Sequence, residues 1–371
     1  MTVPYLFSFG GMRIGLPFSM SKMNLVNKKS YTLRTDINYG FLNKDVNGLV
    51  SFTRRYNPFT QSYYSADASR TFVQIFSGDA WINQLSRRNY YLDNSIGGGW
   101  GREVVNGFNI KISARTALRR SLANYKTYSV VDTVFKDVFD NNKAPAFESY
   151  NALYGALEIS YTPFQPYIRE PNQKINLESK WPTAFARWQK GIPKIFNSDV
   201  NFDYQEFGLQ QFLRLGTAGV SNYTVKTGSF INKKDLKLVD YKYQRRGDPF
   251  LFLNPEQAFQ ALDSTFPVFK RFYEGHYLHE FNGAILNRIP LFKKIGLREV
   301  GGTGFLIAPE ADLRYVELFT GVEKVVKLPF QFLQKIKIGA YVVSSYANRY
   351  NNPLQFKFGI TTWDSFGNRW R

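Results

Sequence analysis

Residues 31–41 alternate between two kinds of side chain, and this alternation is the strongest constraint on the fold. One set of positions is mostly apolar or aromatic: Tyr31, Leu33, Thr35, Ile37, Tyr39 and Phe41. The positions between them are polar, charged or glycine: Thr32, Arg34, Asp36, Asn38 and Gly40. A period of two places these sets on opposite faces of a β-strand, so it predicts a strand and not a helix. The pattern resumes after NKDVNG, which we expect to be a hairpin turn.

The same alternation recurs along the chain. It is strong in residues 12–20, 105–119, 150–163, 199–215, 275–286, 297–308, 315–323, 335–345 and 354–363. It is weaker in residues 46–56, 67–77, 88–100, 177–190, 217–231 and 257–268. Together these segments predict about sixteen strands. NKDVNG and GREVVNG both resemble short turns at the same end of the strands. Counting strands places them at opposite ends, so we expect one strand between residues 57 and 100 to be missing or superfluous.

Composition distinguishes a soluble β-sandwich, with its apolar face inward, from an outer-membrane barrel, with that face toward lipid. Aromatic residues make up 17% of the 371 residues, although the mean hydropathy is −0.33. No apolar run reaches the length of about 18 residues that a membrane-spanning helix needs. The chain has no cysteine, which suits a barrel closed by hydrogen bonds. We therefore predict an all-β fold, a transmembrane antiparallel β-barrel that forms a single domain over residues 1–371.

The formal net charge of +19 has two interpretations. Nucleic-acid binding would require a basic patch or motif. The basic residues are instead spread through strands and loops, for example at Arg34, Lys111, Arg115, Lys335 and Lys337. We expect them near anionic outer-membrane lipid and lipopolysaccharide and in a basic lumen, with no nucleic-acid partner.

The first residues, MTVPYLFSFG, lack the basic and apolar regions of a signal peptide. We expect the chain to be a mature fragment or the C-terminal part of a longer precursor.

The chain contains two histidines, His276 and His279, in GHYLHEFNG. This stretch resembles the His-x-Ser-Asn-Gly signature of outer-membrane phospholipases, but Phe281 stands where the nucleophilic serine belongs. We therefore expect structural roles for both histidines. The spacing offers too few ligands for a metal site. The sequence predicts no catalytic residue, no metal site, no cofactor and no enzyme activity.

The stretch YKYQRRGDPFLFLNP, residues 241–255, interrupts the strand pattern with arginines, a glycine and prolines. It is either an external loop with a Gly-Asp-Pro turn or a loop that folds back into the lumen. In the lumen, Arg246 would need a carboxylate partner, for which Glu280 is the candidate. On that hypothesis, Arg246→Ala destabilises the plugged state and raises conductance.

Four stretches, GMRIGLPF, GREVVNGFNIKIS, HYLHEFNGAILNRIPLFKKIGLREVGG and YVELFTGVEKV, support a family resemblance. The chain resembles the C-terminal barrel of a family of Bacteroidetes outer-membrane proteins with an N-terminal carboxypeptidase-regulatory-like domain. That barrel is similar to the BamA/TamA-type surface-antigen superfamily of assembly and translocation factors.

The resemblance implies a sixteen-stranded barrel whose first and last strands meet at a weak seam, here residues 12–20 and 354–366. The seam side chains would be Met12, Ile14, Leu16, Phe18, Leu354, Phe356, Phe358 and Ile360. It also implies a lumen loop with a Val-Arg-Gly-aromatic motif. Arg246 and Gly247 match that motif, whereas Arg245 and Asp248 replace its first and last residues. Two features differ from the superfamily pattern: residues 1–371 include no counterpart of its periplasmic polypeptide-binding domains, and the last residues read GNRWR where the resemblance implies a final aromatic residue.

The function implied is protein insertion, translocation or assembly at the outer membrane, together with other envelope proteins such as periplasmic or surface lipoproteins. One alternative is a passive or anion-selective pore lined by Arg34, Arg54 and Lys357. Another is a structural barrel in a secretion or surface-lipoprotein machine. An outer-membrane hydrolase that depends on His279 is the remaining one.

Overall fold

A computed structural model describes residues 11–24, 26–75, 89–126, 143–327, 335–350 and 354–362. Fifteen strands form one antiparallel sheet in the order β1-β2-β3-β4-β5-β6-β7-β10-β11-β12-β15-β16-β17-β18-β19. Their bounds are β1 Arg13–Met23, β2 Ser30–Gly40, β3 Asp45–Asn57, β4 Ser62–Gln74, β5 Tyr90–Val105, β6 Phe108–Arg120, β7 Tyr150–Tyr161, β10 Thr183–Gly191, β11 Asn201–Arg214, β12 Val220–Asp235, β15 Phe272–Glu280, β16 Arg298–Ala308, β17 Leu313–Lys327, β18 Lys335–Ala347 and β19 Gln355–Thr362. No helix among these residues is long and apolar enough to cross a membrane.

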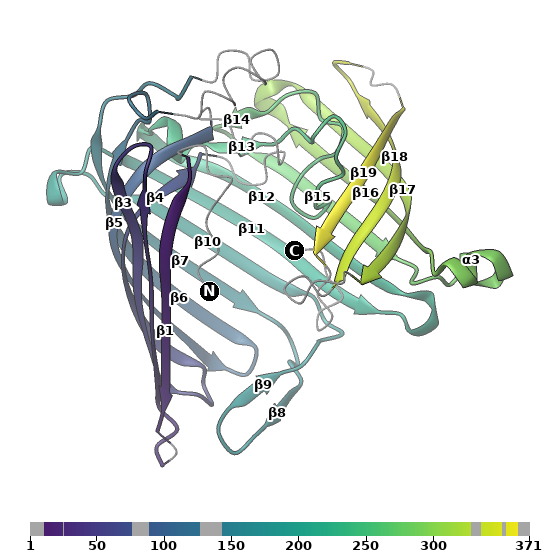
Figure 1. Cartoon of the computed structure of the whole chain (residues 1–371), viewed down its shortest axis with the longest axis horizontal. Coiled ribbons are helices and arrows are strands. Elements are labelled where there is room, and N and C mark those ends of the chain that lie inside the picture. Colours follow the sequence, from purple (N-terminus) through teal and green to yellow (C-terminus); the bar gives the residue numbers. More distant parts are fainter. Residues whose placement is uncertain are drawn as a thin grey trace.

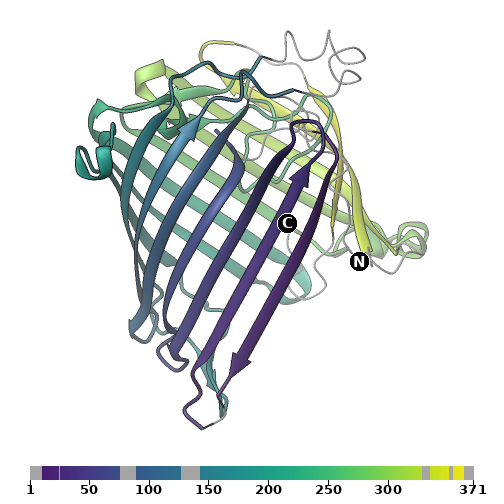
Figure 2. The same cartoon turned by 60° about the vertical axis from the view of Figure 1, so that its left-hand side comes forward.

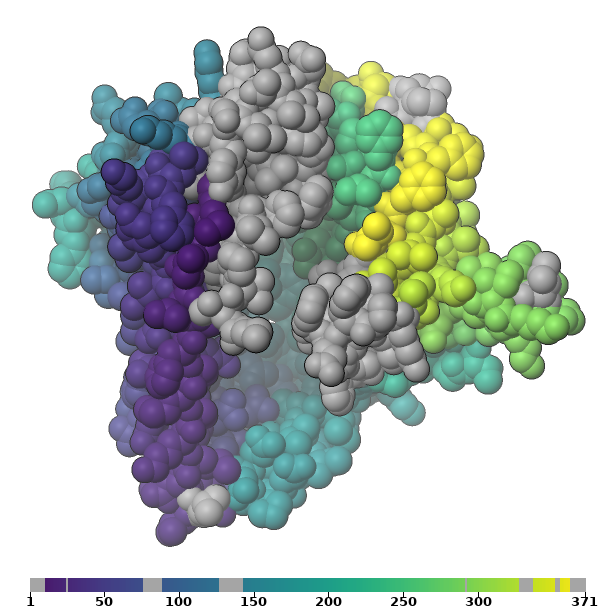
Figure 3. Space-filling model, viewed as in Figure 1, coloured from purple at the N-terminus to yellow at the C-terminus, as the bar shows by residue number. Residues whose placement is uncertain are grey.

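The sheet curls around a central space, with β1 and β19 as its two ends (Figure 1). The tilted N-terminal strands lie side by side in Figure 2. Figure 3 shows the N-terminal strands in purple and the C-terminal strands in yellow on opposite sides of one face. Strand twist makes a sheet of this size curl. Among the described residues, β1 and β19 do not pair, so the structure is an open barrel and does not show the closed one that we predicted.

Small elements occupy the connections. A hairpin of β8 (Tyr167–Arg169) and β9 (Lys174–Asn176) lies between β7 and β10, and the short helix α3 (Pro290–Ile295) lies between β15 and β16. Residues 236–271, between β12 and β15, contain the 3₁₀ turn η5 (Leu238–Asp240) and the paired strands β13 (Lys242–Gln244) and β14 (Phe266–Val268). We call residues 236–271 the plug segment.

The apolar positions of the alternating pattern face outward. In β2, Ile37 is 51% exposed, and in β19 Phe358 is 64% exposed. The opposite face of the sheet contains buried polar and charged side chains such as Glu206, Glu317 and Lys337. This is the reverse of a soluble sandwich, because the apolar surface is outside and the polar surface is enclosed.

Fifteen of the sixteen predicted strands overlap strands of the sheet. The prediction for residues 257–268 is wrong, since they belong to the plug segment. Only the last three of them, Phe266–Val268, form a strand, the short β14. Prolines and Gly247 nearby favour irregular backbone over a spanning strand. Residues 363–366 of the predicted seam lie outside the described residues.

The turn predicted at NKDVNG is also displaced. Strand β3 already begins at Asp45, so the turn consists of residues 41–44, with Lys44 in a left-handed conformation at φ 51°. Asp45 is fixed at the strand start by Arg13, whose Nη1 lies 2.9 Å from its carboxylate. The turn in GREVVNG is at Asn106 and Gly107, and the φ of Gly107 is +81°. With β3, β4 and β5 in between, the two turns lie at opposite ends of the sheet, so the predicted number of strands between them was correct and the assumption of a shared end was wrong.

Candidate functional site

The plug segment lies against the inward face of the sheet (Figure 1). Gly247 permits its tight path, because a Cβ there would lie 2.4 Å from the carbonyl oxygen of Gln260. Asp248 stabilises the next turn, since its Oδ1 accepts the backbone N–H groups of Phe250 and Leu251, both at 2.8 Å. The segment is therefore an ordered loop that is folded against itself and the sheet.

The first polar contact docks η5 against β6. Arg119 Nη1 lies 2.6 Å from Asp240 Oδ1, and Arg119 Nε lies 3.4 Å from Asp93. The Tyr154 hydroxyl donates to Asp240 Oδ2 at 3.1 Å. Burial raises the pKa of the Asp240 carboxyl above its ordinary value, and the Arg119 guanidinium beside it opposes this rise.

A second group of polar contacts holds β13 and the residues after it. Lys242 Nζ lies 3.2 Å from Glu206 on β11. The Gln244 side chain donates to Glu274 on β15 at 3.1 Å. Asn222 on β12 donates to Glu256. Two acidic side chains of the wall thus accept donors of the plug segment, and the plug segment accepts one donor of the wall.

The third polar contact is made by Glu317 of β17, a side chain 1% exposed. Its carboxylate accepts the backbone N–H of Gln260 at 2.8 and 3.0 Å and that of Ala261 at 3.0 Å. The Tyr315 hydroxyl also donates to it at 2.7 Å. One carboxylate therefore satisfies two buried backbone donors of the plug segment.

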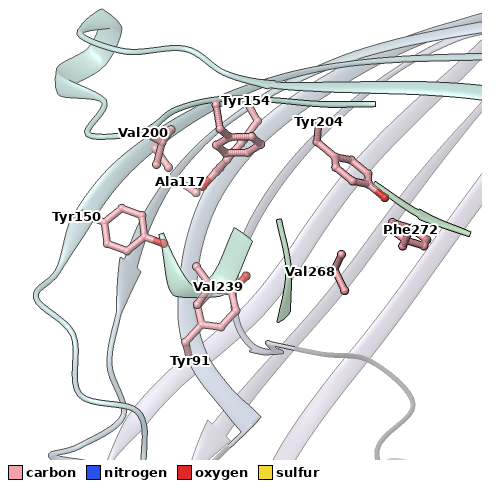
Figure 4. Close-up of a cluster of buried hydrophobic side chains, with 11 residues drawn as sticks. Tyr91, Ala117, Tyr150, Tyr154, Val200, Tyr204, Val239, Val268 and Phe272 are labelled. Atoms are coloured by element: carbon pink, nitrogen blue, oxygen red, sulfur yellow. The ribbon is translucent and has the colours of Figure 1, made fainter. Parts of the chain in front are cut away.

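Apolar packing completes the interface. Phe252 stacks on Tyr341 with ring centroids 3.7 Å apart, and Phe259 lies 4.6 Å from the His276 ring. Figure 4 shows Val239 and Val268 of the plug segment among the tyrosines and Phe272 of the inward wall. The arrangement is a docked plug that blocks part of the lumen by direct contact.

The model of the C-terminal domain of a family of unknown function (DUF5686) matches residues 5–322. The chain belongs to this family. No curated protein matches the chain.

Solved structures of outer-membrane barrels show a weak likeness. BamA from Haemophilus ducreyi lacking POTRA domains 1–3 has a TM-score of 0.48 and 11% identity, with 94% of this chain and 67% of that chain covered. OccK10 (OpdN) of Pseudomonas aeruginosa has a TM-score of 0.36 and 9% identity, with 93% of this chain and 89% of that chain covered. Wzi of Escherichia coli is an outer-membrane carbohydrate-binding β-barrel involved in group 1 capsule assembly. It has a TM-score of 0.36 and 8% identity, with 97% of this chain and 80% of that chain covered. These values do not discriminate between the functions of the three proteins.

The structure places the predicted Arg246–Glu280 pair differently. Arg246 is exposed, and its backbone N–H donates to Thr265 Oγ1 at 3.1 Å. Glu280 instead lies 3.1 Å from Lys337 Nζ, which also lies 2.9 Å from Glu323. The plug segment folds back into the lumen, which is one of the two alternatives predicted for residues 241–255. Its ionic contacts are made by Asp240 and Lys242 and not by Arg246.

We therefore expect Arg246→Ala to leave the conductance of the protein in planar bilayers unchanged, in contrast to the expectation from the sequence. An exposed guanidinium contributes little to docking. Lys242→Ala is the matched comparison, because it removes a basic side chain of the same segment that does reach the wall, at Glu206. A rise in conductance for Arg246→Ala that equals or exceeds that for Lys242→Ala would contradict these contacts.

The predicted seam side chains lie on the two edge strands or beside them. Ile14, Leu16 and Phe18 of β1 are 44%, 72% and 54% exposed, and Met12 precedes that strand. On the other edge, Phe356 and Ile360 are 69% and 72% exposed, and Leu354 directly precedes β19. The two edges do not pair within the described residues, and the opening of a seam between them stays a prediction.

The histidines lie on opposite faces of β15. His276 is buried inside, where its Nε2 lies 2.9 Å from Glu274 and its ring contacts Phe259. His279 faces outward, with Nδ1 2.7 Å from Ser221 Oγ and Nε2 2.9 Å from the carbonyl oxygen of Ala218. Ser221, 3% exposed, is covered, so this serine–histidine contact offers a substrate no access. The predicted absence of enzyme activity stays a prediction.

Glu317, Lys337 and Glu206 were not predicted as site residues. Each is a charged residue within an alternating strand, as in YVELFTGVE around Glu317. A charge at an inward position of a barrel strand needs a partner, and that requirement is the signal that could have identified them.

Proposed function

We propose that this chain is an outer-membrane β-barrel that assists the insertion or translocation of proteins at that membrane. The observation that supports this best is the open sheet, whose ends β1 and β19 do not pair with each other among the described residues, while the plug segment fills part of the lumen. An unpaired strand edge is a template for another strand. A blocked lumen beside such edges suits work at the edge better than diffusion through the centre.

The outward surface supports the membrane location. Exposed apolar and aromatic side chains recur on strands from β1 to β19, among them Phe18, Tyr39, Phe207, Leu318 and Phe356. In water such a surface would promote aggregation, whereas lipid tails would cover it. Outer-membrane lipid and lipopolysaccharide are thus the proposed surroundings, and other envelope proteins are the proposed partners.

The pore alternative has weaker support. Of its predicted lining residues, Arg54 faces outward, where Nη1 donates to the Tyr64 hydroxyl at 2.9 Å. Lys357 faces inward but is 1% exposed and donates to the carbonyl oxygen of Asp248 in the plug segment. The third residue, Arg34, faces inward and is exposed. The buried charges of the inward wall are largely acidic, for example Glu206, Glu274 and Glu317.

Single-channel recording from the refolded chain in a planar bilayer separates the two functions. We expect small, flickering currents from a protein that keeps the heat-dependent gel mobility of a barrel. Large, steady steps that scale with salt would favour the pore.

A direct test measures the folding rate of a urea-unfolded outer-membrane barrel that is diluted into phospholipid vesicles. Vesicles that contain this chain should accelerate folding relative to empty vesicles. Vesicles with an unrelated barrel at the same protein-to-lipid ratio control for bilayer defects, and equal rates in both would refute the proposal.

A further inference from the structure

The edge of β19 that faces away from β18 is hydrogen-bonded to the plug segment. The Phe358 N–H donates to the carbonyl oxygen of Phe250 at 2.9 Å, and the Phe252 N–H donates to the carbonyl oxygen of Phe358 at 2.7 Å. Leu251 forms a parallel β-bridge with Phe358. Residues 250–252 therefore use the edge groups that a neighbouring strand would use.

Three further contacts hold these residues at the edge. The Asp248 carboxylate accepts the N–H groups of Phe250 and Leu251, which fixes the turn that precedes them. The Asp248 carbonyl oxygen accepts a hydrogen bond from Lys357 of β19 itself. Phe252 inserts between Tyr341 and Phe319, with ring centroids 3.7 and 5.1 Å away. One short segment thus contacts both the edge of β19 and the lumen wall.

We propose that residues 248–252 are a latch: they occupy the pairing edge of β19, and another strand can pair there only after the segment leaves. Two strands cannot bond to the same Phe358 groups at once, so latch binding and edge pairing exclude one another. Release of residues 250–252 and exposure of this edge are therefore a single event. The latch contact does not depend on the proposed function. Only the identity of the incoming strand, a segment of another polypeptide, rests on the proposed function.

Amide hydrogen exchange of the refolded barrel in detergent tests the contact. In the wild type we expect protection of both the Phe358 and the Gly359 amides, because the former bonds to the latch and the latter points toward β18. Asp248→Ala removes the acceptor of the turn and should accelerate exchange at Phe358 about tenfold, with Gly359 unchanged. Asp248→Asn keeps an acceptor oxygen and is the matched control, with Phe358 protected. Equal protection at Phe358 in all three proteins would overturn the proposal.

A cysteine pair tests the same contact without weakening it, and the chain offers a background free of cysteine. Leu251→Cys with Phe358→Cys should form a disulfide in the folded protein and restore the protection of the backbone amide at position 358 in the Asp248→Ala background. Tyr243→Cys with Pro267→Cys joins paired residues of β13 and β14 at the base of the plug segment. This control pair should also form but should not restore the protection. Failure of the first pair alone would overturn the latch.

The vesicle folding assay then relates the latch to function. The disulfide-locked protein should lose the acceleration of client folding, and reductant should restore it. Equal acceleration by the locked and reduced forms would overturn the role of the latch. If even the reduced and wild-type forms give no acceleration, the proposed function fails, while the exchange result still decides the latch contact.

Discussion

Glu317→Ala is expected to undock the plug segment and to raise the conductance of the barrel. The carboxylate accepts hydrogen bonds from two buried backbone N–H groups, those of Gln260 and Ala261. Alanine removes this acceptor from both groups. A buried donor that loses its acceptor costs about 1–3 kcal/mol. The cost falls on the docked state alone, because water satisfies these groups once the segment leaves. Bilayer recordings should therefore show larger and longer openings than the wild type.

Glu158→Ala is the matched control for this prediction. Glu158 is also an acid on the inward wall, but it is 48% exposed and lies 3.8 Å from Lys111, away from the plug segment. Its removal should change stability by less than about 0.5 kcal/mol and leave the conductance unchanged. Glu317→Gln keeps one acceptor oxygen and should be intermediate. Similar recordings for Glu317→Ala and Glu158→Ala would show that Glu317 does not hold the plug segment.

Lys337→Met is expected to destabilise the C-terminal part of the sheet by about 3–5 kcal/mol, because it leaves two buried carboxylates without their shared cation. Lys337 Nζ lies 3.1 Å from Glu280 and 2.9 Å from Glu323, and the lysine is 1% exposed. Methionine fills a similar volume, so the loss reports charge and not packing. The urea midpoint of unfolding, followed by gel mobility in detergent, measures it.

A second variant separates the electrostatic cause from a general folding defect. Lys337→Met combined with Glu280→Gln and Glu323→Gln removes all three charges and should recover most of the lost stability. Such non-additivity is expected of residues in one network. If the triple variant is as unstable as Lys337→Met or less stable, the buried network is not the source of the effect.

The strands could be predicted because the side chains of each strand alternate between those suited to the outside of the sheet and those suited to its inside. In β2 and β19 most alternate side chains are apolar, and the structure exposes several of them, such as Ile37 and Phe358, outside the sheet. The pattern also continued through residues 257–268, where the prediction was wrong. Periodicity is a local property, and it does not reveal that the buried groups of Ala258 and Phe259 pack in the lumen instead of spanning the sheet.

The site was predicted only in outline. The interrupted pattern of residues 241–255 indicated an unusual loop, and the resemblance directed attention to Arg246 and Gly247. Gly247 is required by the close backbone approach, whereas Arg246 is exposed. The partner of Glu280 could not be chosen from sequence, because Lys337 is 57 residues away and many cations lie nearer along the chain.

The sequence by itself determined the strands, their apolar faces and the loop that interrupts them, since these depend on neighbouring residues and a period of two. Only the tertiary structure decided which charges meet inside the sheet, and that the plug segment bonds to the edge of β19. Those contacts join residues such as Asp248 and Lys357, which are 109 positions apart. Their pairing depends on the curvature and register of the whole sheet, which no local pattern specifies.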